Sequence, residues 1–139
     1  MYTQVSLGHA EAQSAIAAVQ AELLRRKKAA VIAVADAHGE LIALLRLDGA
    51  PLASIQIAAN KAWTAARERK PTRQIGQDMR DPQDGFDIAF YGDMRYVGWG
   101  GGVPVIQNGA VVGAVAVSGL PEAEDMEVVQ LGVAAILQP

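Results

Sequence analysis

The chain has no cysteine and few aromatic residues. Without cysteine it cannot form disulfides, thiolate nucleophiles, iron–sulfur clusters or thiolate zinc sites, so any metal would need His, carboxylate, Tyr or Met ligands. Aromatic residues make up 5% of the 139 residues, whereas hydrophobic residues make up 51%, much of it Ala and Val. This composition predicts one globular domain over residues 1–139, in which small side chains pack closely against a sheet.

The chain also lacks an excess of basic charge and any long apolar run. Its formal net charge is −3 and its basic and acidic residues are interspersed, which disfavours nucleic acid and anionic membranes as partners. No apolar run approaches the roughly 20 residues of a spanning helix, and the N-terminus lacks the charged and apolar regions of a signal peptide. We therefore expect a cytoplasmic protein.

Hydrophobic periodicity predicts four helices and two hairpins. The helices are expected from Ser6 as N-cap to Lys28, over 52–69, over 72–79 with Thr72 as cap, and from near Glu122 onward with Met126, Val129, Val133 and Ile136 facing the core. The strands are expected at 30–35, 41–46, 103–107 and 110–117. Asn108-Gly109 between apolar runs favours a type I′ turn. Tight turns join antiparallel neighbours, so the order predicts an antiparallel sheet with helices packed on it.

Polar residues gather where the second predicted strand gives way to the second helix. Arg46 and Asp48 flank a chain reversal, and Ser54 and Lys61 lie on one stripe of the helix that follows. This arrangement predicts one wall of a ligand pocket. The alternative is that Lys61 is an ordinary exposed helix lysine.

A glycine-rich loop, Gly98-Trp99-Gly100-Gly101-Gly102, precedes the third strand. Consecutive glycines let a backbone approach a ligand closely, and their amides can form an anion-binding nest. The loop has neither the Gly-Lys-Ser/Thr of a Walker A motif nor the spacing of a dinucleotide fingerprint. A glycine bulge leading into a strand is the competing interpretation.

Most of the aromatic residues lie mid-chain, at Phe86, Phe90, Tyr91 and Tyr96. They could line an apolar ligand cavity or simply roof the core beneath a long loop.

The two histidines and an acidic cluster are two further groups of residues that could bind a metal ion. His9 and His38, the only histidines, are weak metal-ligand candidates at expected surface positions. Four acids open the last helix, Glu122, Glu124, Asp125 and Glu127. They suit the positive end of the helix dipole, with cation binding as the alternative.

Several motifs occur in a fixed order along the chain: Val34-Ala35-Asp36-Ala37-His38-Gly39-Glu40-Leu41, Arg46-Leu47-Asp48-Gly49-Ala50, Ala58-x-x-Lys61-Ala62-x-x-Ala65, Gly100-Gly101-Gly102-Val103-Pro104-Val105, Asn108-Gly109, and Val112-Gly113-Ala114-Val115-Ala116-Val117-Ser118-Gly119. Together they resemble the GlcG/HbpS/PduO C-terminal family, often labelled heme-degrading or heme-binding. The resemblance spans nearly the whole chain.

The resemblance implies an α/β (α+β) fold like that of profilin and roadblock proteins, with a central antiparallel sheet flanked by helices, and assembly into dimers or larger homo-oligomers. It places the ligand-binding pocket at Arg46, Asp48, Ser54, Lys61, Gly100, Gly101, Gly102 and Val103, with Tyr91 and Tyr96 among the aromatics of a lid. Heme or a related tetrapyrrole is the ligand that it implies. For an axial ligand the sequence offers His9 and His38, with Tyr91, Tyr96, Met79 and Met94 as weaker candidates.

Three functions fit these residues. In the first, the protein binds heme or a related tetrapyrrole, and Arg46 and Lys61 hold its anionic group. In the second, it is an enzyme or accessory subunit acting on a small oxygenated organic acid, with Lys61 as acid or base and Arg46 orienting a carboxylate. In the third, it is a structural oligomerisation module.

Overall fold

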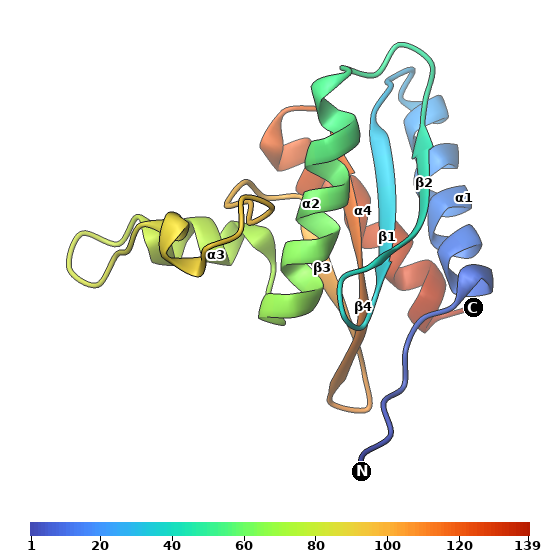
Figure 1. Ribbon diagram of the computed structural model, residues 1–139. Helices are drawn as coiled ribbons and strands as arrows, with labels where there is room; N and C mark the ends of the chain where they lie inside the picture. The colour runs from blue at the N-terminus through green and yellow to red at the C-terminus, as the bar shows by residue number, and fades with distance from the viewer.

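The computed structural model describes residues 1–139 and has one four-stranded antiparallel sheet with the order β2-β1-β4-β3 (Figure 1). The strands are β1 (Val31–Asp36), β2 (Leu41–Arg46), β3 (Gly102–Gln107) and β4 (Ala110–Ser118). The helices are α1 (His9–Arg25), α2 (Ala53–Glu68), α3 (Thr72–Met79), the 3-10 helix η1 (Ile88–Tyr91) and α4 (Glu122–Leu137). The predicted single-domain α+β fold is confirmed.

Both hairpins use the turn chemistry that the sequence indicates. Asn108 and Gly109 have φ of 51° and 79°, the two positive values that a type I′ turn requires. In the turn between β1 and β2, the Asp36 carboxylate accepts hydrogen bonds from the backbone N–H of His38 and Glu40, at 2.8 and 3.0 Å. The turns therefore fix the register of two neighbouring strand pairs.

Helices α1 and α4 cover one face of the sheet and α2 covers the other (Figure 1). The side chains of β1 alternate accordingly, with Ile32 and Val34 in the core under α1 and α4, and Val31 and Ala33 in the core under α2. The α2 side of the core is rich in alanine, including Ala58, Ala62 and Ala116. These small side chains let α2 lie close to β4, which positions Lys61.

Two predicted helix caps are wrong, because both hydroxyls serve other segments. Helix α1 begins after Gly8, and the Ser6 hydroxyl accepts a hydrogen bond from Ala37 N at 3.0 Å. Pro71 is the N-cap of α3, and the Thr72 hydroxyl accepts from Gly102 N at 2.9 Å. Long-range contacts thus replace local capping at both positions.

Three of the four residues of α4 that were expected to face the core do so. Val129 is buried in the core, and Val133 and Ile136 are partly buried and pack against it. Met126 is partly buried outside that cluster. The buried positions are Asp125, Val128, Val129 and Gly132. An acidic residue therefore occupies a core position of this helix.

The segment between α2 and β3 projects from the body of the molecule as an arm that carries α3 and η1 (Figure 1). Its large apolar side chains include Phe90, which is 84% exposed, and Met94, which is 100% exposed.

None of the helices combines the length and the apolar character needed to cross a lipid bilayer.

Candidate functional site

The amine of Lys61 lies inside the protein, beside the C-terminal end of β4. The residue is 3% exposed. Its Nζ donates hydrogen bonds to the Val117 carbonyl at 3.0 Å and to Asp125 Oδ2 at 3.3 Å. An ammonium group has three N–H donors, so two of them are satisfied within the protein.

The glycine-rich loop closes over this amine. Gly101 has φ of 123°, a value that favours glycine. A Cβ on Gly101 would lie 2.8 Å from Lys61 Nζ and 2.6 Å from the Val117 carbonyl. Only glycine therefore lets the loop backbone pack this closely against the amine. Gly102 packs against the backbone of the same residue, since a Cβ added to Gly102 would lie 2.5 Å from the Lys61 carbonyl oxygen.

A cleft of about 350 Å³ opens from Lys61 toward the surface. Its lining consists of Ser54, Ile57 and Lys61 from α2, Trp99 and Gly100 from the loop, residues 118–120 after β4, and Glu122 and Asp125 from α4. Within it, the Ser118 hydroxyl donates to the Ser54 hydroxyl at 3.2 Å. The cleft thus combines an amine, two carboxylates and two hydroxyls.

Burial controls the charge of the ion pair. It lowers the pKa of the Lys61 amine, although the Asp125 and Glu122 carboxylates oppose the shift. Burial also raises the pKa of Asp125, against the opposing effects of Lys61 and of the hydrogen bond from Leu120 N. Both shifts favour the neutral forms, because a low dielectric disfavours charge. Lys61 is therefore easier to deprotonate than an ordinary lysine.

Glu122 keeps its charge more readily than Asp125. Its Oε1 accepts a hydrogen bond from Gly100 N at 2.7 Å, and Arg73 lies 3.0 Å from the same oxygen. The Gly100 bond is the main reason that the pKa of Glu122 is lowered, and Arg73 adds to the effect. This contact also ties the glycine loop to the first turn of α4.

The structure brings together part of the predicted site. Ser54, Lys61 and Gly100 line the cleft. Gly101 and Gly102 are buried behind its surface, and Val103 is partly buried in β3.

Arg46 and Asp48 lie elsewhere, in a separate hollow of about 240 Å³ shared with α1. Arg46 and Ser118 are both paired with Val31 of β1, on opposite sides of it. Two strand spacings, about 10 Å, therefore separate them.

The predicted lid aromatics pack on α2 rather than along the cleft. Tyr91 and Tyr96 stack with ring centroids 4.4 Å apart, and Tyr96 meets Trp63 edge-on at 4.8 Å. Trp99, which is 59% exposed, is the aromatic residue in the cleft lining.

The sequence interpretation also missed Ser118, Glu122 and Asp125 as parts of one site. Asp125 had a recognisable signal, because it shares a helical stripe with Val128 and Val129.

The two histidines lie on the surface in different elements. His9 is the first residue of α1 and His38 belongs to the turn between β1 and β2, and both are exposed. No group of three or more His, Cys, Asp or Glu side chains is arranged to hold a metal ion.

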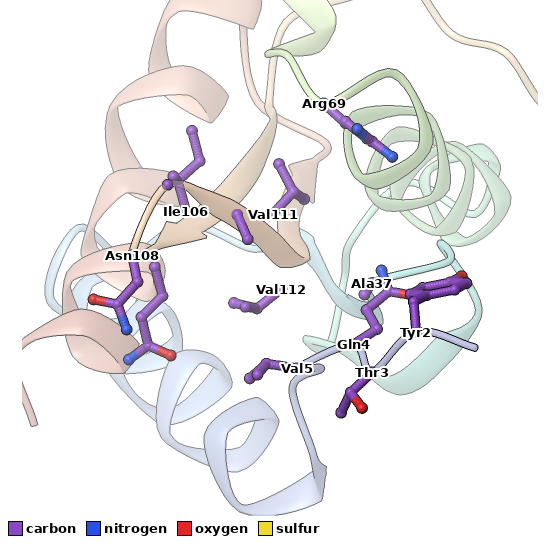
Figure 2. Close-up of a pocket in the computed structure, with 13 residues that line it drawn as sticks. Tyr2, Thr3, Gln4, Val5, Ala37, Arg69, Ile106, Asn108, Val111 and Val112 are labelled. Carbon is purple, nitrogen blue, oxygen red and sulfur yellow. The ribbon is translucent and has the colours of Figure 1, made fainter.

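A second, larger hollow of about 650 Å³ lies between the N-terminal segment and the β3–β4 hairpin. It is lined by residues 2–5, by 106–112, and by Ala37 and Arg69, and Figure 2 shows Val5, Val111 and Val112 grouped between Asn108 on one side and Arg69 on the other. Val5 is 66% exposed and Ile106 is 51% exposed. The hollow therefore offers apolar surface together with a guanidinium group.

The two hollows lie at opposite ends of β4. Residues 110–112 of this strand line the larger hollow and Ser118 lines the cleft. Nine residues of antiparallel strand, Ala110–Ser118, span about 27 Å. One ligand of ordinary size cannot fill both.

Comparison with known proteins assigns the chain to a family. Residues 7–134 match the family model described as "Haem degrading protein HbpS-like". GlcG of Escherichia coli K12 is 36% identical over 85% of this chain and 85% of its own length. The crystal structure of Klebsiella pneumoniae protein ORFY matches this chain at 31% identity and a TM-score of 0.93, and the match covers 99% of this chain and 96% of that protein. The crystal structure of a PduOC:heme complex matches at 25% identity and a TM-score of 0.88, and the match covers 95% of this chain and 96% of the PduOC chain. The chain therefore belongs to the HbpS-like family.

Proposed function

We propose that this protein binds heme or a related tetrapyrrole in the large hollow beside its N-terminal segment. The observation that carries the proposal is the similarity to the PduOC:heme complex, which extends over 95% of the chain at a TM-score of 0.88. Membership of the HbpS-like family supports the same class of ligand.

The large hollow fits such a ligand better than the cleft at Lys61. Its volume of about 650 Å³ falls well within the roughly 300–1,000 Å³ of small-molecule sites, whereas the cleft has about 350 Å³. Exposed apolar side chains such as Val5 and Ile106 suit the face of a macrocycle. The Arg69 guanidinium suits a propionate, since Arg–carboxylate pairs form strong charge-assisted hydrogen bonds.

The neighbourhood of this hollow also contains donors for iron. The lining includes the phenol of Tyr2, and His38 follows the lining residue Ala37 in the chain. Phenolate and imidazole are both known axial ligands of heme. A bound heme would supply a redox-active iron, while the protein supplies the apolar walls and the guanidinium.

Hemin titration of the full chain tests this function. We expect saturable growth of a shifted Soret band with one heme per chain. The variants Tyr2→Phe, His38→Ala and His9→Ala then identify the iron ligand, because its removal changes the band position while the other two leave it unchanged. If hemin gives only the spectrum of free hemin, the proposal is wrong.

A second candidate function belongs to the cleft at Lys61. We propose that the cleft binds a small oxygenated organic compound, either an acid or a carbonyl compound, as an enzyme or an accessory subunit would. The observation that favours it is a buried amine that lines a cleft of about 350 Å³. Calorimetric titration with small organic acids and carbonyl compounds tests binding, with weaker binding expected for Ser54→Ala than for wild type, and absence of binding in the wild-type protein would contradict this function.

We also propose that copies of the chain assemble into a homo-oligomer through the arm. Phe90 and Met94, at 84% and 100% exposure, leave apolar surface of the kind that marks interfaces. Light scattering should give a multiple of the chain mass for wild type and a smaller mass for Phe90→Ser with Met94→Ser. A monomeric wild-type protein would contradict the proposal.

A further inference from the structure

We propose that Lys61 is a nucleophile that condenses with a small aldehyde or ketone in its cleft to form an imine. This inference rests on the second candidate function, the binding of a small oxygenated compound there, and is independent of heme binding. It names the substrate class, a carbonyl compound, and the bond that forms, between Lys61 Nζ and the carbonyl carbon.

The position of the amine supports this role. Lys61 Nζ is held by two acceptors, the Val117 carbonyl at 3.0 Å and Asp125 Oδ2 at 3.3 Å. A Cβ on Gly101 would lie 2.8 Å from the same atom, so the loop packs tightly against one side of the amine and helps to fix it. The side chain lines a cleft of about 350 Å³ although it is 3% exposed. A fixed, buried amine facing a cavity is an arrangement suited to nucleophilic attack.

Asp125 is placed to move the protons that condensation requires. It takes one proton from the Lys61 ammonium, which frees the lone pair to attack the carbonyl carbon. A second nitrogen proton moves to the carbonyl oxygen and gives a carbinolamine. Asp125 then returns its proton to the departing hydroxyl, which leaves as water. The products are a protonated imine and water, and the Asp125 carboxylate is restored.

The rest of the cleft suits a small substrate with one carbonyl oxygen. The hydroxyls of Ser54 and Ser118 lie 3.2 Å apart in the lining, and each can donate to that oxygen. Two acidic groups face the amine from α4, Asp125 and Glu122. Glu122 is paired with Arg73 at 3.0 Å, so the lining adds little net charge. Neutral carbonyl compounds and short oxo acids are therefore both candidate substrates, and the experiment distinguishes between them.

Reductive trapping tests the inference on the full chain. The protein is incubated near neutral pH with acetaldehyde, or with pyruvate, in the presence of cyanoborohydride, and the adducts are mapped by peptide mass spectrometry. The internal control is the set of other lysines, Lys27, Lys28 and Lys70. We expect Lys61 to be labelled several-fold faster than Lys70, because burial lowers its pKa and the cleft holds the carbonyl compound beside the amine. Acetaldehyde and pyruvate together show whether the cleft accepts a carboxylate.

Variants make the result specific. Lys61→Arg keeps a cation but forms no such adduct, and Lys70→Arg is the matched surface control that should leave Lys61 labelling unchanged. If Lys27, Lys28 and Lys70 react while Lys61 stays unmodified in the wild-type protein, the inference is overturned without any variant. Binding of pyruvate by calorimetry without an adduct would overturn the covalent step and leave the second candidate function standing. Absence of both removes that function as well.

Discussion

The two hollows at the ends of β4 are built from different kinds of residue. The cleft at Lys61 consists largely of buried polar groups that also hold α2, β4 and α4 together, as the contacts to Val117 and Asp125 show. The hollow beside the N-terminal segment consists largely of exposed side chains, such as Val5 and Ile106. The reactive groups and the larger binding volume therefore lie at different ends of the fold, so substitutions at one end should leave the function of the other end intact.

The largest expected effect is on stability. Asp125→Ala should lower the free energy of unfolding by about 3 kcal/mol, because it leaves the Lys61 amine buried without its partner. Replacing both residues, as Lys61→Met with Asp125→Leu, should cost less than Asp125→Ala alone. Urea unfolding measures both. A loss below about 1 kcal/mol for Asp125→Ala would show that the pair is not part of the framework.

Arg69 offers the opposite case, a change in binding without a loss of stability. Arg69 is the C-cap residue of α2 and has φ of 59°. Arg69→Gly therefore relieves backbone strain, because glycine adopts this left-handed conformation freely. We expect its free energy of unfolding to stay within about 1 kcal/mol of wild type while its hemin affinity falls about tenfold, the loss of one charge-assisted hydrogen bond. Arg46→Ala, which removes a guanidinium that is also exposed but lies in a different hollow, is the matched control and should bind hemin normally.

The pH dependence of trapping should distinguish Lys61 from a free amine. Burial lowers the pKa of Lys61 below the ordinary value of 10.5, so its neutral fraction saturates at a lower pH. With Nα-acetyl-lysine methylamide in the same tube as reference, the ratio of Lys61 labelling to reference labelling should be highest near neutral pH and fall as the pH rises. A ratio that does not change with pH would contradict the shift.

The two hydroxyls of the cleft should have a modest effect. Ser54→Ala removes the acceptor of the Ser118 hydrogen bond and should lower the free energy of unfolding by about 1 kcal/mol. It should also slow trapping at Lys61, because one donor to the carbonyl oxygen is lost. An unchanged trapping rate would mean that the substrate oxygen lies elsewhere.

The smallest expected effect is at Asp48. This exposed residue lies with Arg46 outside both principal hollows. Asp48→Ala should leave hemin affinity and Lys61 trapping unchanged within error. A clear loss of either would restore the pocket expected at the strand–helix junction, for example through a second subunit.

The fold could be predicted from the sequence because its signals are local. Asn108-Gly109 predicts a two-residue turn from two adjacent residues, β2 has the bounds that its pattern predicted, and α3 ends at Met79 as predicted. The caps at Ser6 and Thr72 failed, since their hydroxyls bond to segments about 30 residues away in sequence. Spacing along the chain does not encode such partners.

The site could be predicted only in part. Helical spacing placed Ser54 and Lys61 on one wall. It could not place Arg46, because the distance between β2 and β4 depends on β1 lying between them. Asp125 was missed because the helix dipole gave a sufficient reason for an acid at that position. The large hollow depends on residues 2–5, which show no periodic pattern.

The separation of the two hollows can be measured most directly by NMR of the protein with one equivalent of ferric heme. The paramagnetic iron broadens amide signals close to it. We predict broadening of residues 3–5 and 109–112, at the hairpin end of β4, while the signals of Gly100 and Gly119 at the cleft stay sharp. Broadening centred on Gly100 and Gly119 would place heme in the Lys61 cleft and contradict the account.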